Sequence, residues 1–316
     1  MIVVLTGGTG GAKFAEGLQQ VARADELTFI VNTGDDLRWW GLPVSPDLDS
    51  ITYALAGLLS RERGWGIEGD TFDFLGVKRS QGAPVWFRVG DRDLATHRAR
   101  AQILAEGRTL SEATQELVSR LGVAARILPM SDDRVETRVE TPLGELSFEE
   151  YFVRERHQVP VTRVRFVGAE QAQPALGVLE AIERADAILL APSNPITSLG
   201  PILAVPGIRQ ALRASAAPVV AVSPIVGGAA VSGPAAALME MEGFAATASG
   251  VARAYADFLD VLVVDSRDTG EIEQIEALGV YALATNTIMT TTQDRAALAE
   301  FALEAARHAA PREAAR

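Results

Sequence analysis

The sequence predicts an α/β, Rossmann-like fold: a mainly parallel sheet with helices on both faces and an inserted region of helices and a β-hairpin. Three observations predict it. Short β-branched runs recur along the chain, each run ends in a glycine-rich or polar loop, and the segments between them have helical periodicity. Apolar runs of this kind are typical of parallel strands buried on both faces. The 316 residues, 48% of them hydrophobic, are enough to form a large core.

Five runs are predicted as strands of the parallel sheet, and each ends in a loop of small or polar residues. They are residues 2–5, 28–31, 187–190, 219–222 and 261–264. Ligands of open α/β sheets bind at the carboxyl ends of the strands. We therefore expect the functional site among the loops that follow these five runs.

Helices are expected between the strands. After the first loop, Phe14, Leu18 and Val21 are spaced to lie on one face of a helix. Further along, Thr109 and Glu112 have the spacing of a capping box, which predicts that a helix begins there.

The middle of the chain has a different pattern. Residues 134–140 and 145–148 alternate between apolar and polar around a Pro-Leu-Gly turn, which predicts a β-hairpin. We therefore predict that residues 1–60 and 165–316 form the Rossmann-like nucleotide-binding core. Residues 61–164 are expected to form the inserted region.

Composition excludes several classes of protein. The chain has no Cys, which excludes a disulfide scaffold, a thiolate metal site and a Cys nucleophile. The net charge of −12, without any basic run, makes nucleic acid and membrane surfaces unexpected partners. No targeting segment precedes the first apolar run, so we expect a cytoplasmic protein. Oligomeric state is not indicated, and a homodimer is left open.

The first loop, residues 7–13, reads Gly-Gly-Thr-Gly-Gly-Ala-Lys. Glycines at the start of a helix let the backbone amides approach a phosphate group. The loop matches neither the Walker A nor the dinucleotide fingerprint, so a plain tight turn is the alternative. An ammonium group near a helix start is unfavourable unless an anion lies nearby. The candidate phosphate-binding residues are therefore Gly7, Gly8, Thr9, Gly10 and Lys13.

Three pairs of Asp residues follow expected strands or precede expected helices, at positions 35 and 36, 47 and 49, and 132 and 133. Such pairs are often helix caps or solvated turns. Beside a phosphate ligand they also make a Mg²⁺ site plausible, and a carboxylate can serve as a general base. We take Asp49 and Asp132 as the candidate metal ligands.

Two further loops offer groups that bind anions or nucleotides. Arg88 lies in a charged loop and has the paired N–H donors that hold an anionic or carbonyl group, although a salt-bridged loop is the alternative. Ser193 and Asn194 follow a predicted strand and are candidates for binding a nucleotide phosphate or base. His97 is expected to be a structural side chain.

The loops form an ordered set of motifs from residue 5 to residue 260, and together they resemble the 2-phospho-L-lactate transferase family. That family builds coenzyme F420 from the deazaflavin precursor Fo. Residues after about 290 carry no matching motif. The matching segments are residues 7–10 with Lys13, 32–33, 45–49, 65–68, 70–72, 90–93, 95–97, 129–133, 193–198, 223–225, 231–234 and 257–260.

The resemblance implies a reaction and roles for some of these residues. The ribityl hydroxyl of Fo (7,8-didemethyl-8-hydroxy-5-deazariboflavin) attacks the outer phosphorus of a guanosine diphospho-conjugated three-carbon acid, and GMP leaves. Asp49 and Arg88 would contact Fo, with Asp49 orienting or deprotonating the hydroxyl, and the inserted region would contribute to the Fo site. The acid is 2-phospholactyl or phosphoenolpyruvyl. The Arg-rich, Lys-poor composition indicates a bacterial source, and the resemblance implies that bacterial members tend to use the phosphoenolpyruvyl donor.

Two alternatives of other classes are weighed against this transferase. A related family of non-enzymatic regulatory proteins uses a similar glycine opening to bind a nucleotide sugar. Asp49 and the Gly-Asp-Arg-Asp segment at residues 90–93 favour the transferase over that family. A dinucleotide oxidoreductase is weakened by the incomplete glycine fingerprint, although Asp35 or Asp36 could act as its ribose-binding acid.

Overall fold

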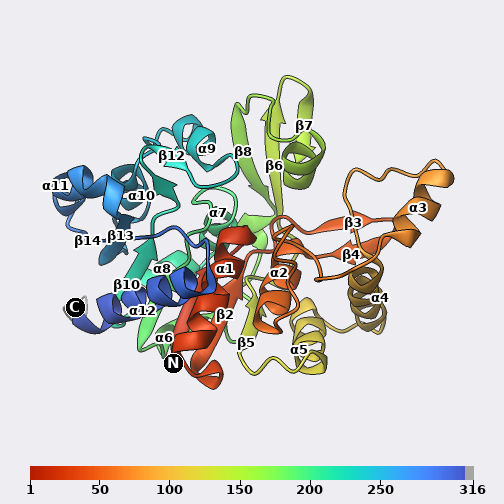
Figure 1. Ribbon diagram of the computed structural model, residues 1–316, viewed down its shortest axis with the longest axis horizontal. Helices are drawn as coiled ribbons and strands as arrows, with labels where there is room; N and C mark the ends of the chain where they lie inside the picture. The colour runs from red at the N-terminus through yellow and green to blue at the C-terminus, as the bar shows by residue number, and fades with distance from the viewer. Residues whose placement is uncertain (310–316) are drawn as a thin grey trace.

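The computed structural model describes residues 1–309 and contains a seven-stranded sheet in which every neighbouring pair of strands is parallel (Figure 1). The order across the sheet is β14–β13–β10–β9–β1–β2–β5. The predicted fold class and all five predicted strands are confirmed. The strands are β1 (Ile2–Thr6), β2 (Leu27–Val31), β5 (Arg126–Pro129), β9 (Ala187–Leu190), β10 (Val219–Val222), β13 (Val261–Asp265) and β14 (Tyr281–Thr285).

Helices cover both faces of the sheet. Successive side chains of a strand point to opposite faces, and in the inner strands the side chains on both faces are apolar and buried. Val3 and Leu5 of β1 pack into one core, and Val4 packs into the other. One face is covered by α1 (Gly8–Val21), α2 (Pro46–Leu55), α5 (Leu110–Arg120) and α12 (Thr292–His308). The other is covered by α6 (Val178–Glu183), α7 (Leu199–Ala204), α8 (Ile208–Ala214), α9 (Ala235–Met241), α10 (Ala248–Tyr255) and α11 (Ile272–Glu276).

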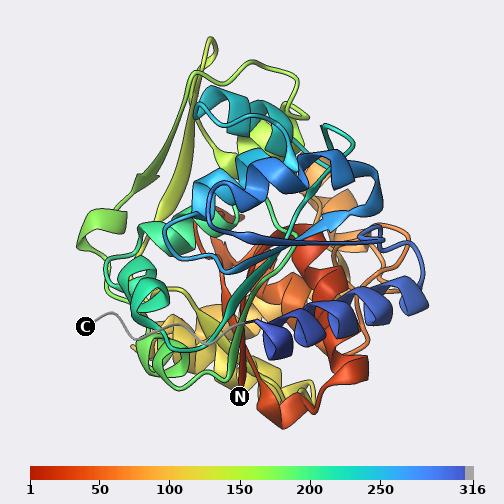
Figure 2. The same cartoon turned by 90° about the vertical axis from the view of Figure 1, so that its left-hand side faces the viewer.

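The first and last helices lie side by side (Figures 1 and 2). They approach closely at Gly17, where an added Cβ would lie 2.2 Å from the carbonyl oxygen of Arg295. The Arg295 guanidinium pairs with Glu16 of α1 at the same crossing. A side chain at position 17 would therefore push the two helices apart.

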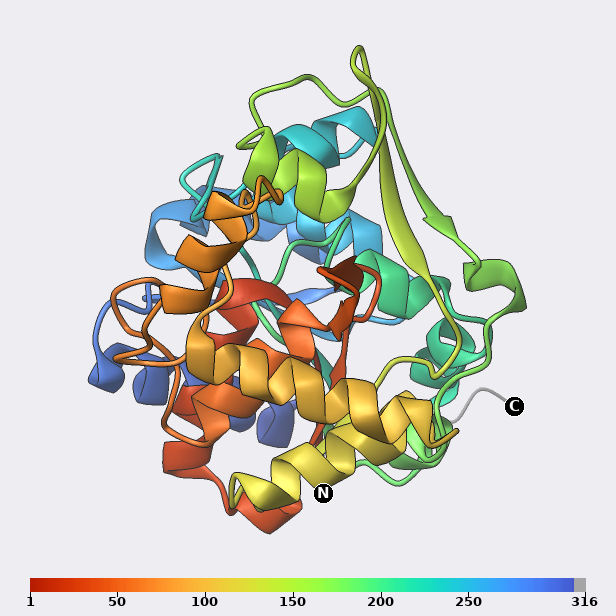
Figure 3. The same ribbon diagram turned by 90° about the vertical axis from the view of Figure 1, so that its right-hand side faces the viewer.

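Smaller units lie outside the sheet. The predicted hairpin is confirmed as β6 (Glu136–Thr141) and β7 (Gly144–Ser147), and β8 (Arg163–Val167) joins β6 to complete a projecting three-stranded sheet (Figure 3). The remaining elements are β3 (Leu37–Trp39), β4 (Leu42–Val44), α3 (Asp73–Ser80), α4 (Asp91–Ala105), β11 (Ile225–Val226), β12 (Ala229–Ala230), η1 (Ala24–Glu26), η2 (Glu150–Arg154), η3 (Ala169–Gln171) and η4 (Ser266–Glu271).

The expectation for residues 61–164 needs a correction, because they do not form one continuous insertion. β5 lies within this range and pairs with β2 in the central sheet. Its last residue, Pro129, has no N–H group to donate, and this is tolerated because β5 is the edge strand. The sequence of β5, Arg-Ile-Leu-Pro, is short and differs from the β-branched runs of the inner strands, so this strand was not predicted.

Strand order determines where a ligand can bind. Along the chain, β1, β2 and β5 extend the sheet to one side, and β9, β10, β13 and β14 extend it to the other. The direction reverses between β1 and β9, and crevices at such switch points are the usual ligand sites of this architecture. Among the described residues, no helix is both long and apolar enough to cross a membrane.

Candidate active site

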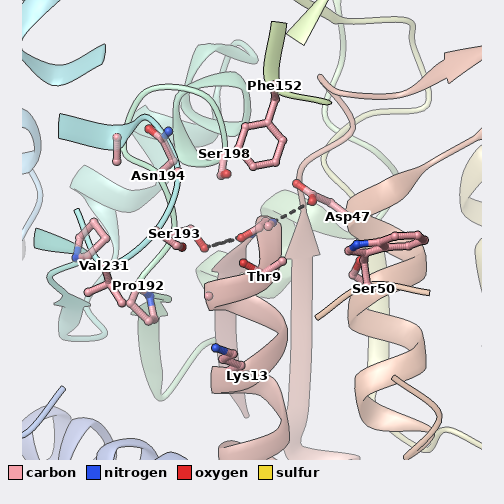
Figure 4. A pocket seen from close by; sticks show the side chains of 18 of the residues that line it. Thr9, Lys13, Asp47, Ser50, Phe152, Pro192, Ser193, Asn194, Ser198 and Val231 are labelled. Carbon is pink, nitrogen blue, oxygen red and sulfur yellow. Dashed lines mark hydrogen bonds between the residues drawn. The ribbon is translucent and has the colours of Figure 1, made fainter. Parts of the chain in front are cut away.

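A cavity of about 630 Å³ lies at the switch point between β1 and β9 (Figure 4). It is lined by loops that follow strands of both halves of the sheet, by the first turn of α2 and by segments from outside the sheet. These are residues 7–10 and 13, 35, 46–47 and 50, 61 and 65, 86–88, 148–149 and 152–153, 192–194 and 197–198, 223–224, 231–235, 287–290 and 295.

The glycine loop forms one wall of the cavity at the start of α1. Gly8 has a φ of +68°, a conformation that favours glycine. The Gly7 N–H donates to Ser193 Oγ at 3.3 Å, and the Ser193 hydroxyl donates to the Gly7 carbonyl at 2.7 Å. The following first-turn amides have no partner within the helix, and Lys13 lies one turn further along (Figure 4). This wall has the features of a phosphate cradle.

The loop after β9 is held by its own side chain. Asn194 Oδ1 accepts hydrogen bonds from the backbone N–H groups of Ile196 at 2.9 Å and Thr197 at 3.3 Å. Such a turn gives a rigid loop between the strand and α7. Asn194 therefore lines the cavity in a fixed position beside the glycine loop.

Carboxylates gather beside the cradle, on the side of α2. Asp47 Oδ1 accepts a hydrogen bond from the Gly8 N–H at 2.7 Å. The Asn32 side-chain amide donates both to Asp47 Oδ2 and to Asp35 Oδ2, at 2.9 Å each, so these two carboxylates meet on one nitrogen. Glu149, which directly precedes η2, lines the same cavity. No lysine or arginine forms a salt bridge with any of the three within the described residues.

No positively charged side chain of the described residues balances the negative charge of this carboxylate cluster. Burial raises the pKa of Asp47 to about 6, and burial together with the charges of Asp47 and Asp36 raises the pKa of Glu149 to about 8. Burial and the neighbouring charges of Asp47 and Glu149 likewise hold the pKa of Asp35 well above its usual range. One oxygen of Asp35, Oδ1, is buried and accepts no hydrogen bond from the described residues. The cavity therefore holds buried carboxylates without a salt-bridge partner, although within the described residues their oxygens do not form a compact group of metal-ligand atoms like that of Asp49, Asp93 and His97.

The far end of the cavity is aromatic and basic. Arg88 is exposed, and its guanidinium lies 4.6 Å from the centre of the Phe72 ring. Trp86 and Trp65 line the cavity near it, whereas Trp39 is buried behind Trp86, with ring centres 4.7 Å apart. A planar ligand in the cavity can therefore reach Trp86, whereas it cannot reach Trp39.

Asp49 does not line the cavity, although Asp47 does. Two residues along a helix differ in direction by about 200°, so the two side chains point to opposite sides of α2. Asp49 is 5% exposed and forms a two-point ion pair with Arg100 of α4. With Asp93 and His97 it also forms a group whose ligand atoms lie within 4.8 Å of one another. The Arg100 guanidinium already supplies the cation there, which disfavours a metal ion.

Asp132, the other candidate metal ligand, also lies away from the cavity. It accepts hydrogen bonds from the Ser111 N–H at 2.7 Å and from the Ser111 hydroxyl at 3.0 Å, in the first turn of α5. Asp132 therefore accepts a first-turn N–H of α5, as the helix-capping alternative predicts. The structure does not bring Asp132 and Asp49 together in one metal site.

Nearly the whole of the chain matches a known protein family. The family model described as 2-phospho-L-lactate transferase CofD matches residues 2–303. The chain belongs to the 2-phospho-L-lactate transferase family. One relative, named phosphoenolpyruvate transferase, from Streptomyces griseus, is 48% identical, and the match covers 96% of this chain and 98% of the relative. A 2-phospho-L-lactate transferase from Methanococcoides burtonii is 43% identical, with 92% and 95% covered.

Solved structures of similar fold agree with the architecture. A member of the UPF0052 family from Bacillus halodurans has a TM-score of 0.65, is 19% identical, and is matched over 96% of this chain and 98% of its own. At that identity the likeness concerns the fold. The family match itself identifies the chain as a transferase of the F420 biosynthesis family, and not as a member of either alternative class.

For this transferase-family chain, the structure brings together all the predicted phosphate-binding residues and Arg88, and it adds others that sequence reasoning missed. Glu149 and Phe152 approach the cavity from beyond β7, and residues 287–290 approach from beyond β14. Arg61 lines it from the loop after α2. The only signal for Glu149 was its place at the end of the predicted hairpin.

Proposed function

We propose that the protein transfers a phospho-three-carbon-acid group from its guanosine diphospho-conjugate to the ribityl hydroxyl of Fo, releasing GMP. The observation that carries the proposal is a single cavity with a phosphate cradle and, beside it, a carboxylate cluster without a salt-bridge partner among the described residues. Phosphoryl transfer needs positioning and charge neutralisation more than covalent chemistry. The bond from the ribityl oxygen to phosphorus forms, the bridging bond to GMP breaks, and the hydroxyl loses its proton.

The donor diphosphate is assigned to the glycine loop. Amides at the start of α1 and the ammonium of Lys13 favour an anion there. Ser193 and Asn194 lie beside this loop on the β9 side of the switch point, where a nucleoside is usually bound in this architecture.

Fo is assigned to the end of the cavity lined by Trp86 and Arg88. An aromatic face suits a planar deazaflavin ring, and a guanidinium suits its carbonyl groups. The family resemblance proposes that Asp49 contacts Fo, which would require its pair with Arg100 to open. Asp47 already faces the cavity, so we assign to Asp47 first the orientation or deprotonation of the attacking hydroxyl.

Mg²⁺ is the proposed cofactor, because buried carboxylates face the cavity. Asp35, Asp47 and Glu149 offer the oxygen ligands that Mg²⁺ prefers, and a cation would offset the cost of burial that raises their pKa values. When bound, Mg²⁺ would neutralise charge on the diphosphate and hold its oxygens. The carboxylates that would hold the ion lie beside the glycine loop, where Asp47 contacts Gly8.

We propose the phosphoenolpyruvyl group as the natural donor, giving the dehydro form of the F420 core. Relatives named phosphoenolpyruvate transferase are 46–48% identical to this chain, and those named 2-phospho-L-lactate transferase are 40–43% identical. A pocket separates such near-isosteres by only about 1–3 kcal/mol. We further propose a cytoplasmic location, because nucleotide-activated donors of this kind are made from nucleoside triphosphates inside cells.

One assay tests the reaction and the donor together. Purified protein is given limiting Fo, Mg²⁺ and equal amounts of both guanosine-activated acids, and the products are separated by mass spectrometry. We expect GMP and mainly the unsaturated product, two hydrogens lighter than the lactyl product. Predominance of the saturated product would overturn the donor proposal, and absence of any Fo-linked product would overturn the transfer reaction itself.

A further inference from the structure

A buried polar network joins α2 to α4 behind the cavity. Arg100 is 2% exposed, and it donates to both carboxylate oxygens of Asp49, through Nη1 at 3.1 Å to Oδ2 and through Nη2 to Oδ1. His97 lies between two acids, with Nδ1 3.5 Å from Asp49 Oδ2 and Nε2 3.5 Å from Asp93 Oδ1. The Tyr53 hydroxyl donates to Asp93 Oδ1 at 2.8 Å. Asp49 and Tyr53 belong to α2, and the other three residues belong to α4.

One of the two helices that this network joins, α2, carries part of the cavity in its first turn, and the loop that leads into the other, α4, carries another part. The first turn of α2 carries Asp47, whose carboxylate reaches the amide of Gly8 at 2.7 Å. Trp86 and Arg88 directly precede the start of α4 and line the acceptor end. The relative placement of α2 and α4 therefore determines how far Asp47 lies from the acceptor end of the cavity.

The chemistry of the network suits a geometric role better than a stabilising one. Burying charges costs desolvation energy, and a well-packed apolar cluster in the same place would often be as stable. A guanidinium fork that meets both oxygens of a carboxylate fixes direction as well as distance. The His97 ring fills the space between Asp49 and Asp93, with Nδ1 also 3.4 Å from Arg100 Nη1, so the ring sets how closely the two acids can approach.

We propose that Arg100 and His97 are positioning residues of this transferase. Acting through Asp49 and Asp93, they hold the first turn of α2 against the start of α4, so that Asp47 meets the acceptor hydroxyl beside the donor phosphate. The inference rests on the proposed function, because it concerns the geometry in which the two substrates meet. The donor cradle is built from α1 and the β9 loop and contains no residue of the network, although it meets α2 at the Asp47–Gly8 hydrogen bond.

The test compares Arg100→Lys, Arg100→Met and His97→Gln with Arg209→Met. Arg209 of α8 makes a two-point pair with Asp257, which follows α10, and this more exposed pair lies away from the cavity, so Arg209→Met is the control for loss of an ion pair. Rates are expressed per folded molecule, and GDP binding is measured by calorimetry. We expect kcat to fall about 10-fold or more in Arg100→Lys and His97→Gln, since displacements near 1 Å cost up to 10²-fold. KM for Fo should rise, GDP affinity should stay within about threefold, and Arg100→Met should retain less activity than Arg100→Lys.

Each outcome decides the matter. Variants of Arg100 and His97 whose kcat per folded molecule equals that of Arg209→Met would overturn the positioning role and leave a structural pair. Equal losses of Fo and GDP binding would also overturn it, because a general loosening of the fold affects both. If Arg100→Met does not fold, Arg100→Lys and His97→Gln carry the test. Failure of the proposed function is separate: the wild-type protein would then form no Fo-linked product.

Discussion

Two groups of buried carboxylates lie on opposite sides of α2, and they differ in how their charge is balanced. On the cavity side, Asp47 and Glu149 have pKa values raised by burial, and neither forms a salt bridge with a described residue. On the far side, Asp49 is paired with Arg100. Burial alone would raise the pKa of Asp93, but His97 and Tyr53 hold it below its usual range.

The difference shows how a cluster of acids can be interpreted. Carboxylates that already have a guanidinium and an imidazole beside them are complete, and their role is to hold helices together. Carboxylates that face an open cavity without such partners are incomplete, and a metal ion or a proton completes them. By this criterion the cavity-side acids are the better candidates for chemistry, although Asp47 and Asp49 are only two residues apart.

The largest expected effect is on folding. Asp49→Asn leaves Arg100 buried without its counter-charge, and breaking a buried pair in this way typically costs about 3–5 kcal/mol. Urea denaturation at pH 7 measures the loss. The sequence alone predicts instead that Asp49→Asn nearly abolishes turnover while leaving the fold intact. A variant that keeps its stability and loses only turnover would contradict the distinction between the two groups and return Asp49 to the chemistry.

Next in size is the effect of Asp47→Asn on rate. The substitution keeps the size and can still accept the Gly8 amide, but it removes the negative charge and the basicity that a base or metal ligand needs. We expect kcat/KM to fall about 100-fold or more. Because a repulsive charge is removed, the thermal midpoint at pH 8 should not fall. Activity within tenfold of wild type would show that Asp47 only caps α1.

Lys13→Ala examines the glycine-loop wall of the cavity. If the ammonium neutralises diphosphate charge, GDP binding should weaken by about 1–3 kcal/mol, while Fo binding changes little. Calorimetry measures both. Lys78→Ala is the control, because the other lysine of the chain lies over the rings of Trp40 and Phe74, outside the cavity. Unchanged GDP affinity would leave the glycine loop as a plain turn.

A smaller effect distinguishes the two groups by pH. The folded pKa values of Asp47 and Glu149 lie above those of the unfolded chain, so the folded metal-free protein binds more protons. Its stability should therefore fall as pH rises from 6 to 8, by on the order of 1–2 kcal/mol. Thermal melts in EDTA measure this. Mg²⁺ should remove this loss of stability, and it should bind more tightly at pH 8 than at pH 6. A melting temperature that changes neither with pH nor with Mg²⁺ would argue against a cation site.

Local pattern was enough for much of the fold. The inner strands β1, β2, β9, β10 and β13 are continuous apolar runs because helices cover both of their faces, and that burial is visible in sequence. The edge strands β5 and β14 were not predicted. Each has only one neighbour in the sheet, so partial exposure and Pro129 are tolerated and the apolar signal is weak.

The site was predictable where it follows the core strands and less so elsewhere. The glycine loop and Ser193 are adjacent to strand ends, so their meeting follows from topology. Which of Asp47 and Asp49 faces the cavity depends on the rotation of α2 about its axis, and the Ser-Pro-Asp-Leu-Asp motif does not specify that rotation. Glu149 reaches the site through the docking of a separate small sheet, a contact that no local spacing encodes.

The close crossing of α1 and α12 at Gly17 has a consequence for the order in which the protein is made. The helix that begins with the glycine loop is synthesised well before the helix that packs on it, Thr292–His308, because most of the described chain lies between them. Until α12 emerges, the apolar side of α1 around Phe14 and Leu18 lacks part of its cover. The nascent chain therefore completes the support of its glycine loop only once α12 has been made, and a chain truncated before residue 292 would lack the contact at Gly17.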